Sequence, residues 1–195
     1  MPETVLYPRG AEAPLIEALA DSPVVLVHGP RQCGKTTLAQ VVGEREGRAY
    51  ISFDDGVVQA AAEADPAGFA DDLPPRVTLD EVQRAPALFA ALKVAADRDR
   101  APGRFLLTGS ANVLLVPKLA DSLAGRMAIL RLHPLAQCEL VLQKPDFLDR
   151  LFARGFKARG GTRLGRELTK RIVAGGYPPA LARPPGRRRE AWYLD

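Results

Sequence analysis

The chain has 195 residues, of which 47% are hydrophobic, so it can bury one sizeable core. Two cysteines and two histidines exclude a disulfide framework and argue against a zinc site. The net charge of +4 is compatible with a nucleic-acid partner, but no interleaving of aromatic and basic residues supports one. No secretory signal pattern and no apolar run of membrane-spanning length occurs, so we expect a cytoplasmic protein with no membrane contact.

Strand-like and helix-like segments alternate through roughly the first 130 residues, which predicts an α/β fold with helices on both faces of a parallel sheet. A short helix is expected at 15–20, and the continuous apolar run at 24–27 predicts a buried central strand. A helix is expected to start at Lys35 after this strand. The elements predicted after it are, in chain order, a strand at 49–53, helices around 57–64 and 66–72, a strand at 77–79, a helix opened by Pro86, and strands at 105–107 and 127–132. From about residue 134 the periodicity is helical only, with apolar stripes at 147–152 and 164–172.

A glycine-rich loop with the Walker A spacing Gly-x₄-Gly-Lys-Thr lies between the first strand and the helix at Lys35. In such a loop, backbone N–H groups wrap the phosphates of a nucleotide, and the positive end of the following helix strengthens their field. Lys35 would reach the β- and γ-phosphates, and the Thr36 hydroxyl would ligate Mg²⁺. The expected nucleotide-binding residues are Gly29, Pro30, Arg31, Gln32, Cys33, Gly34, Lys35, Thr36 and Thr37. The sequence therefore predicts that the chain binds ATP with Mg²⁺.

Two adjacent carboxylates, Asp80 and Glu81, follow the strand at 77–79. Ligands of open parallel sheets bind at the carboxyl ends of the strands, so Asp80 is expected to hold the magnesium ion through a water. Glu81 could polarise a water that attacks the γ-phosphate. A dipeptide of this kind is often only a helix cap or a solvated turn, but its position about 45 residues after Lys35 favours the functional interpretation.

Polar residues also end the strand at 105–107. One further strand lies between the two motifs in sequence, which leaves room for another strand between the two motif strands in the sheet. The strand at 105–107 would fill that gap and bring Thr108 and Ser110 beside the γ-phosphate, where they could sense it and orient the water. The alternative is a simple turn with a helix cap at Ser110 or Asn112.

Five motifs in this order resemble the prokaryotic ATPases of the AAA+ superfamily that usually pair an AAA-type nucleotide domain with a C-terminal domain called DUF4143. The motifs lie at 25–38, 79–86, 106–112, 122–126 and 175–178. The resemblance implies an AAA-like P-loop NTPase core with three layers, α/β/α, a five-stranded sheet of order 5-1-4-3-2, ATP as the nucleotide and Glu81 as the general base. The phosphate loop departs from the family in having Cys33 where Val or another small residue is more frequent, a change that we expect to be tolerated.

The resemblance also draws attention to Arg126, the last residue of the Ser-Leu-Ala-Gly-Arg motif. An arginine can stabilise the charge on a transferring phosphoryl group, either in its own subunit or from a neighbouring one in a homo-oligomer. The alternative is an arginine at the surface or at the sheet edge that pairs with a carboxylate. The residues alone leave both interpretations open.

These observations predict a P-loop ATPase core at 1–133, a small helical lid or bridge at 134–183, and a linker or the start of a missing C-terminal domain at 184–195. Members of the resembled family continue for about as long again, so an unknown protein partner or that domain is expected to complete the protein. The leading functional hypothesis is an ATP hydrolase that moves a partner or an attached domain. The alternatives are an ATP-binding switch with little turnover and a P-loop small-molecule kinase, the latter disfavoured because a water-activating carboxylate is a liability where water must be excluded.

Overall fold

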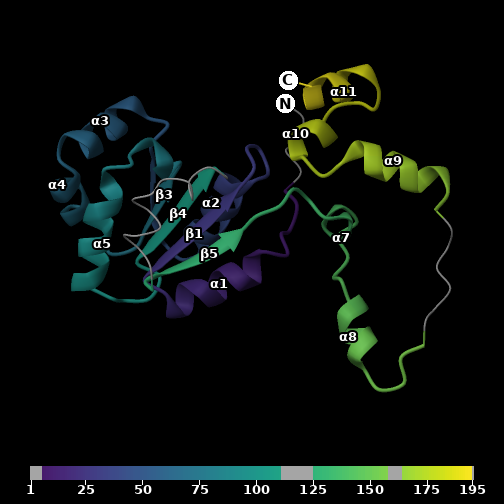
Figure 1. Ribbon diagram of the computed structural model, residues 1–195, viewed down its shortest axis with the longest axis horizontal. Helices are drawn as coiled ribbons and strands as arrows, with labels where there is room; N and C mark the ends of the chain where they lie inside the picture. Colours follow the sequence, from purple (N-terminus) through teal and green to yellow (C-terminus); the bar gives the residue numbers. More distant parts are fainter. Residues whose placement is uncertain (1–5, 111–124, 158–163, 195) are drawn as a thin grey trace. The chain divides into compact units, whose positions relative to one another are not determined.

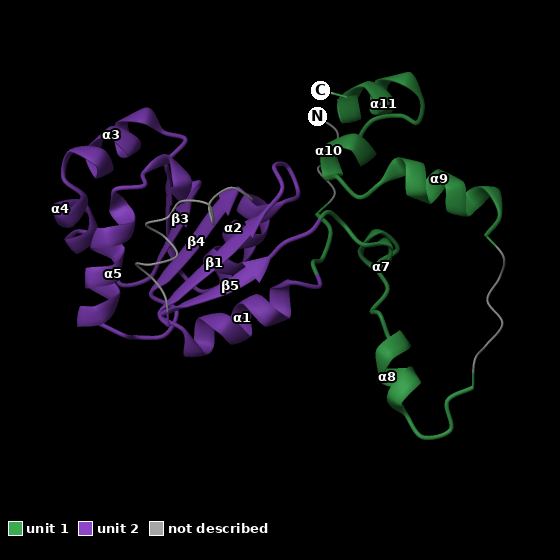
Figure 2. Cartoon of the chain, viewed as in Figure 1, with its two compact units in different colours: residues 1–9, 134–195 green, residues 10–133 purple. Residues whose placement is uncertain are grey.

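The computed structural model describes residues 6–110, 125–157 and 164–194, and Figure 1 shows the elements that they form. The chain divides into two compact units (Figure 2). Unit 2 comprises residues 10–133, and unit 1 comprises residues 1–9 together with 134–195. Unit 2 contains the β-sheet, whereas the regular elements of unit 1 in the described part of the chain are helices.

The sheet of unit 2 consists of five parallel strands. They are β1 (Val24–Gly29), β2 (Ala49–Ser52), β3 (Val77–Asp80), β4 (Phe105–Ser110) and β5 (Met127–Arg131). Their order is β2-β3-β4-β1-β5, and every pair is parallel. This confirms the predicted sheet and its order 5-1-4-3-2, which is the same order counted from the other edge.

The helices of unit 2 are α1 (Glu12–Asp21), α2 (Lys35–Arg45), α3 (Gly56–Ala64), α4 (Pro66–Asp71), the 3₁₀ helix η1 (Val82–Arg84) and α5 (Leu88–Arg98). Local chemistry explains several of the starts. The Asp55 carboxylate accepts a hydrogen bond from the Val57 N–H at 2.8 Å and caps α3. Asp65 caps α4, whose first residue is a proline, a favoured arrangement because proline has no N–H to satisfy there. The helix expected to open at Pro86 begins two residues later, after η1.

The core lies around the central strands β1 and β4. Val24, Val25, Leu26 and Val27 are all fully buried, although successive residues of a strand point to opposite faces. Both faces of the sheet are therefore covered, as expected for a parallel sheet whose crossover connections are helices. Helix α2 packs against β1, β3 and β4, while α1 packs against β1 and β5. The edge strands β2 and β5 are only partly buried.

The register of the parallel strands brings their carboxyl ends to one edge of the sheet. Gly29 at the end of β1 is level with Ser110 at the end of β4. Leu79 of β3 is level with Leu107 of β4, so the next residues, Asp80 and Thr108, are also neighbours. Strand β4 fills the gap between the two motif strands, as the sequence predicts.

The helices of unit 1 are α7 (Gln137–Leu140), α8 (Phe147–Phe152), α9 (Arg166–Ala174), α10 (Pro178–Leu181) and α11 (Arg187–Leu194). Residues 184–195, expected to be a linker or the start of a further domain, thus contain a helix. Its Trp192 lies 5.4 Å from the ring of Tyr177, measured between centroids, and the Tyr193 hydroxyl donates to the Ala174 carbonyl at 2.8 Å. Among the described helices, none combines the length and the apolar character that a membrane crossing requires.

Candidate nucleotide-binding site

The loop between β1 and α2 has the backbone that its glycines allow. Gly34 directly precedes α2 and has φ 100° and ψ 23°, a left-handed conformation that costs a glycine little. Gly29 meets a different constraint, because a Cβ atom built on it would lie 2.1 Å from the Leu132 carbonyl oxygen. Glycine at 34 is thus required by the backbone angles, and glycine at 29 by the close approach of the chain after β5.

Two side chains of the loop face inward. Lys35 is only 4% exposed, and its Nζ atom donates to the Pro30 carbonyl at 2.8 Å. The ammonium group therefore lies over the phosphate loop, where it could contact the phosphates of a bound nucleotide. Cys33 is fully buried, and its Sγ atom donates weakly to the Leu132 carbonyl at 3.6 Å. Its side chain packs against the protein, which leaves its backbone to face a ligand.

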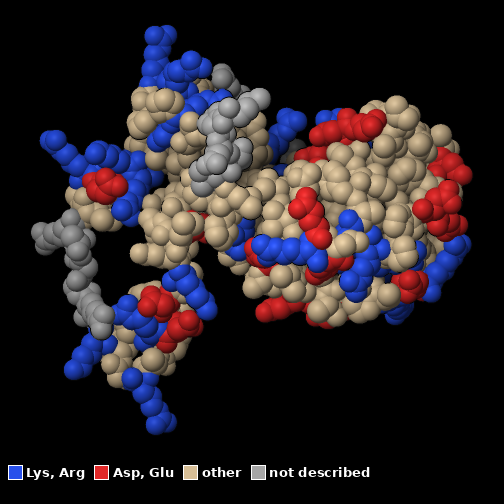
Figure 3. Space-filling view, turned by 180° about the vertical axis from the view of Figure 1, so that it is seen from behind, with Lys and Arg blue, Asp and Glu red and all other residues tan. Residues whose placement is uncertain are grey.

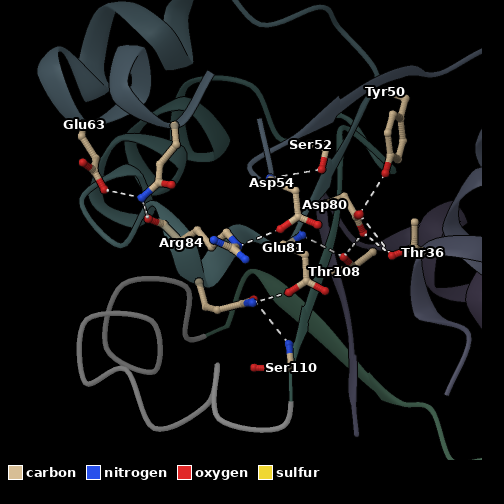
Figure 4. A network of polar contacts seen from close by, with 12 residues as sticks. Thr36, Tyr50, Ser52, Asp54, Glu63, Asp80, Glu81, Arg84, Thr108 and Ser110 are labelled. Atoms are coloured by element: carbon tan, nitrogen blue, oxygen red, sulfur yellow. Dashed lines mark hydrogen bonds and ion pairs between the residues drawn. The ribbon is translucent and has the colours of Figure 1, made fainter. Parts of the chain in front are cut away.

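Asp80 is the centre of a hydrogen-bond cluster at the carboxyl edge of the sheet (Figure 4). Its carboxylate is 2% exposed and accepts from the Thr36 hydroxyl at 3.0 and 3.1 Å, one distance to each oxygen. The Tyr50 hydroxyl donates to Oδ2 at 2.8 Å, and the Thr108 hydroxyl donates to Oδ1. The two residues predicted to hold Mg²⁺, Thr36 and Asp80, thus lie within hydrogen-bond distance of each other.

The oxygen donors present fit a magnesium site. Mg²⁺ binds hard oxygen ligands and usually keeps several waters, taking few ligands from the protein and others from substrate phosphates. The Thr36 hydroxyl and the Asp80 carboxylate supply donors of that kind, and they lie beside the phosphate loop. Within the described ranges no group of three or more His, Cys, Asp or Glu could hold a metal by itself.

Tyr50 also contributes to this cluster, although no sequence motif indicates it. Burial first, and then the hydrogen bond to Asp80, raise the pKa of Tyr50 to about 12, so its hydroxyl remains a donor across the neutral range. A signal for this contact was available. Tyr50 lies two residues before Ser52 on β2 and therefore on the same face of the sheet, and Ser52 is level with Asp80.

Thr108 connects the two adjacent carboxylate residues. Its hydroxyl donates to Asp80 and accepts from the backbone N–H of Glu81 at 3.1 Å. Glu81 has φ 56° and ψ 41°, an unusual conformation for a residue with a side chain. As a result the Glu81 carboxylate points away from Thr36, unlike that of Asp80, and accepts a hydrogen bond from the amide of Gln83 (Figure 4).

Ser110 joins this second cluster through its backbone. Its N–H donates to the Oε1 atom of Gln83 at 3.3 Å. Ser110 is also level with Gly29 of the phosphate loop, across the β1–β4 pair. The end of β4 therefore lies between the loop and Glu81. The alternative of a helix cap at Asn112 concerns a residue outside the described part of the chain.

Arg126 is the one predicted site residue that the structure does not bring to this edge. It directly precedes Met127, which is level with Val24 at the start of β1. The loop begins at the other end of that strand, about 16 Å away at the usual rise per residue. Arg126 instead pairs with Asp97 and holds the pKa of that carboxyl group below its ordinary value through a side-chain hydrogen bond. This placement favours the ion-pair interpretation over a catalytic role in the same subunit.

The parallel sheet in this order, with a glycine-rich loop between its first strand and a helix, defines the chain as a P-loop nucleotide-binding protein. The comparison with known families is more specific. The sequence model of the AAA_14 family, described as an AAA domain, matches residues 21–141, which is more than half of the chain. The chain belongs to this family, and its P-loop unit is an ATP-binding NTPase domain.

The proteins similar to the chain include two curated relatives and a solved structure. The relatives are uncharacterised proteins of Mycobacterium tuberculosis and Mycobacterium bovis, each 42% identical over 148 residues. The match covers 75% of this chain but only 32% of each relative, so the chain spans about a third of their length. The Walker-type ATPase PABY2304 of Pyrococcus abyssi has a TM-score of 0.56 at 20% identity, covering 93% of this chain and 68% of that one. That likeness supports the fold alone.

Proposed function

We propose that this chain is a Mg²⁺-dependent ATP hydrolase in which Glu81 is the general base. The observation that carries the proposal is the hydrogen-bond cluster that joins Thr36 of the phosphate loop to Asp80 and, through Thr108, to the backbone of Glu81. A nucleotide-binding module needs the loop and the metal ligands. It does not need a second carboxylate at the same strand end. The presence of Glu81 there therefore favours ATP turnover over simple binding.

Each side chain has a distinct role in this proposal. Lys35 and the backbone N–H groups of the loop bind and orient the phosphates, and Thr36 and Asp80 hold the magnesium ion. The ion, when bound, neutralises charge that develops on the phosphate oxygens. Glu81 accepts a proton from the attacking water, which must come within about 3 Å of its carboxylate. Thr108 and Ser110 report the presence of the γ-phosphate to this carboxylate through the end of β4.

Two alternatives are separable from hydrolysis by experiment. An ATP-binding switch would bind Mg·ATP with little turnover, and a small-molecule kinase would transfer phosphate to an acceptor other than water. Adjacent Asp80 and Glu81 favour hydrolysis, because a carboxylate that activates water would waste ATP in a kinase. Coupling of hydrolysis to the movement of a protein partner, or of an attached domain such as DUF4143, is part of the same proposal and concerns a longer protein than this chain.

The deciding measurement is phosphate release from Mg·ATP, beside nucleotide binding, for wild type, Lys35→Ala and Glu81→Gln. Lys35→Ala should abolish binding. Glu81→Gln should bind Mg·ATP normally and lose on the order of 100-fold in kcat, the usual contribution of a general base. Glu17→Gln, an exposed carboxylate change on α1, is the matched control and should leave both quantities unchanged. Equal turnover of wild type and Glu81→Gln would exclude Glu81 as the base, and binding without turnover by wild type would favour the switch.

We propose that Arg126 acts on the nucleotide of a neighbouring subunit in a homo-oligomer. Arg126→Ala should then lower turnover at high protein concentration, where subunits associate, and not at low concentration. Arg100→Ala is the control, since Arg100, which follows the end of α5, also contacts Asp97, at 3.6 Å. A rate that is unchanged by Arg126→Ala at every concentration would remove Arg126 from the site and leave only its ion pair with Asp97.

A further inference from the structure

Gln83 makes two hydrogen bonds that the roles above do not use. Its Nε2 atom donates to the Glu81 carboxylate, and its Oε1 atom accepts from the Ser110 N–H at 3.3 Å. The two partners belong to different strand ends, since Glu81 follows β3 and Ser110 ends β4. One partly buried side chain thus bridges the proposed base and the strand end that faces the phosphate loop (Figure 4).

The chemistry of the bridge requires a side chain that both donates and accepts. A carboxylate accepts hydrogen bonds only, and a backbone N–H donates only, so a side chain between them must donate at one end and accept at the other. Glutamine does both without a charge. Glutamate at the same position could accept from Ser110 but would repel Glu81, and methionine, of similar size and shape, has no donor and only a weakly accepting sulfur.

The backbone on both sides of Gln83 is held in place. Val82 is fully buried in the core cluster, and the Arg84 side chain pairs with Asp54 at 2.8 Å. The Arg84 carbonyl also accepts from the Gln59 amide at 3.0 Å. Because its neighbours in η1 are anchored in this way, Gln83 presents its amide from a fixed position.

The conformation of Glu81 makes such a support necessary. Its positive φ is a strained state that costs a residue with a side chain about 1 kcal/mol or more and persists only where the surroundings enforce it. Two contacts do so here: the hydrogen bond from the Glu81 N–H to Thr108 fixes the backbone, and the bond from Gln83 fixes the carboxylate. Without Gln83, the carboxylate would keep its backbone anchor but lose the contact that orients it.

We infer that Gln83 is a positioning residue that orients the Glu81 carboxylate and couples it to the end of β4. This inference rests on the proposed hydrolase function, in which Glu81 is the base. A general base must be held within about 0.5 Å of its productive position, and small misplacements are costly in rate. Movement of the Ser110 backbone on contact with the γ-phosphate is passed to Glu81 through the amide, so the base responds to the presence of ATP.

The test is a double-mutant cycle on turnover with Gln83→Met and Glu81→Gln. Gln83→Met should lower kcat about 10-fold and leave KM and the Kd for Mg·ATP within about twofold, because it disturbs the base and not the loop. Introduced into Glu81→Gln, the same change should have no further effect on the residual rate. Gln83→Glu keeps the acceptor for Ser110 and loses the donor to Glu81, so its kcat should fall at least as far. Gln143→Met, the same change at an exposed glutamine of unit 1 that takes no part in these contacts, should leave kcat unchanged.

The outcomes separate this inference from the proposed function. Equal turnover of wild type and Glu81→Gln would overturn both. A wild-type rate well above that of Glu81→Gln, with Gln83→Met equal to wild type, would overturn the positioning role alone. A rise in kcat would show that the bridge restrains Glu81 and would equally contradict the inference. Loss of Mg·ATP binding, or a further fall in the Glu81→Gln background, would assign Gln83 a structural role instead.

Discussion

The two units use their apolar residues in different ways. The largest fully buried side chains in the described part of the chain all belong to unit 2: Leu15, Leu26, Phe53, Leu79, Leu88, Phe89, Leu92, Phe105, Leu106 and Leu107. In unit 1 the apolar stripes of the helices remain largely exposed, and Phe152 and Ile172 are 83% and 70% exposed. A stripe of the right period therefore predicts a helix in both units, but it predicts burial only where a sheet offers a surface to cover.

The charges differ in the same way. Unit 1 carries 14 Lys and Arg against 7 Asp and Glu, whereas unit 2 carries 13 against 16, so the basic excess of the chain belongs to unit 1. Figure 3 shows Lys and Arg projecting from unit 1, while both signs are interspersed on the visible face of unit 2. The chemistry described above lies in the unit with the dense core. That is expected, because catalytic geometry needs rigid support.

Truncation of one large apolar side chain in each unit tests this contrast in stability. Leu107→Ala removes a fully buried side chain from a central strand and should lower the free energy of unfolding by about 3 kcal/mol. Ile172→Ala removes an exposed one and should change it by no more than about 0.5 kcal/mol. Urea denaturation followed by circular dichroism measures both. Comparable losses for the two variants would mean that Ile172 is covered in solution and that the contrast is false.

The two cysteines provide a chemical version of the same comparison. Cys33 of the phosphate loop is fully buried, and Cys138 of unit 1 is only partly buried. A maleimide reagent should therefore label Cys138 at least about 10-fold faster, because Cys33 reacts only when the loop opens. Mg·ATP should slow the labelling of Cys33 further by binding the closed form, and leave Cys138 unaffected. Mass spectrometry of peptides over time gives both rates. Labelling of the two thiols at one rate would contradict the packed loop.

Much of unit 2 could be predicted from the sequence because its pattern reflects local physics. The apolar run at 24–27, the glycines at 29 and 34 and the carboxylates at 80 and 81 are typical of a buried strand, a phosphate loop and a strand end. The sheet order followed from one further argument, that β4 fills the gap between the motif strands. The placement of Arg126 was open to the same reasoning, since a residue just before a parallel strand lies at the edge opposite the carboxyl ends.

The contacts of Tyr50 and Gln83 are harder to predict for a physical reason. Tyr50 of β2 contacts Asp80 of β3, which is distant in sequence, and Gln83 joins Glu81 to the end of β4. Both contacts depend on side-chain length, and that of Gln83 depends also on the unusual backbone of Glu81. No periodicity indicates a positive φ at a residue other than glycine. The helices of unit 1 could be predicted as helices from their stripes, but how far those stripes are buried depends on tertiary contacts that no local pattern specifies.

Tyr50→Phe tests whether the cluster around Asp80 is as rigid as its burial indicates. The change removes one hydroxyl donor, at 2.8 Å from Oδ2, and retains the ring. We expect the Mg²⁺ concentration that half-saturates turnover to rise about 3-fold, the effect of losing a single hydrogen bond. Nucleotide binding in the absence of Mg²⁺ should be unchanged. Tyr193→Phe, the matched change in unit 1, should leave the Mg²⁺ dependence as it is. A Tyr50→Phe enzyme with wild-type Mg²⁺ dependence would mean that Thr36 and Thr108 hold Asp80 without help.

The same tyrosine predicts a small difference in stability at alkaline pH. Since its pKa is raised to about 12 from an ordinary value of 10, the folded protein retains the phenolic proton in a range where the unfolded chain releases it. The stabilisation from this group is fully present below about pH 10 and is lost as the pH rises toward 12. The urea midpoint of wild type should therefore fall more between pH 8 and pH 11 than that of Tyr50→Phe, which has no proton to lose at this position. Parallel declines of the two midpoints would show that the hydroxyl is equally solvated in both states, and that the hydrogen bond to Asp80 does not form in solution.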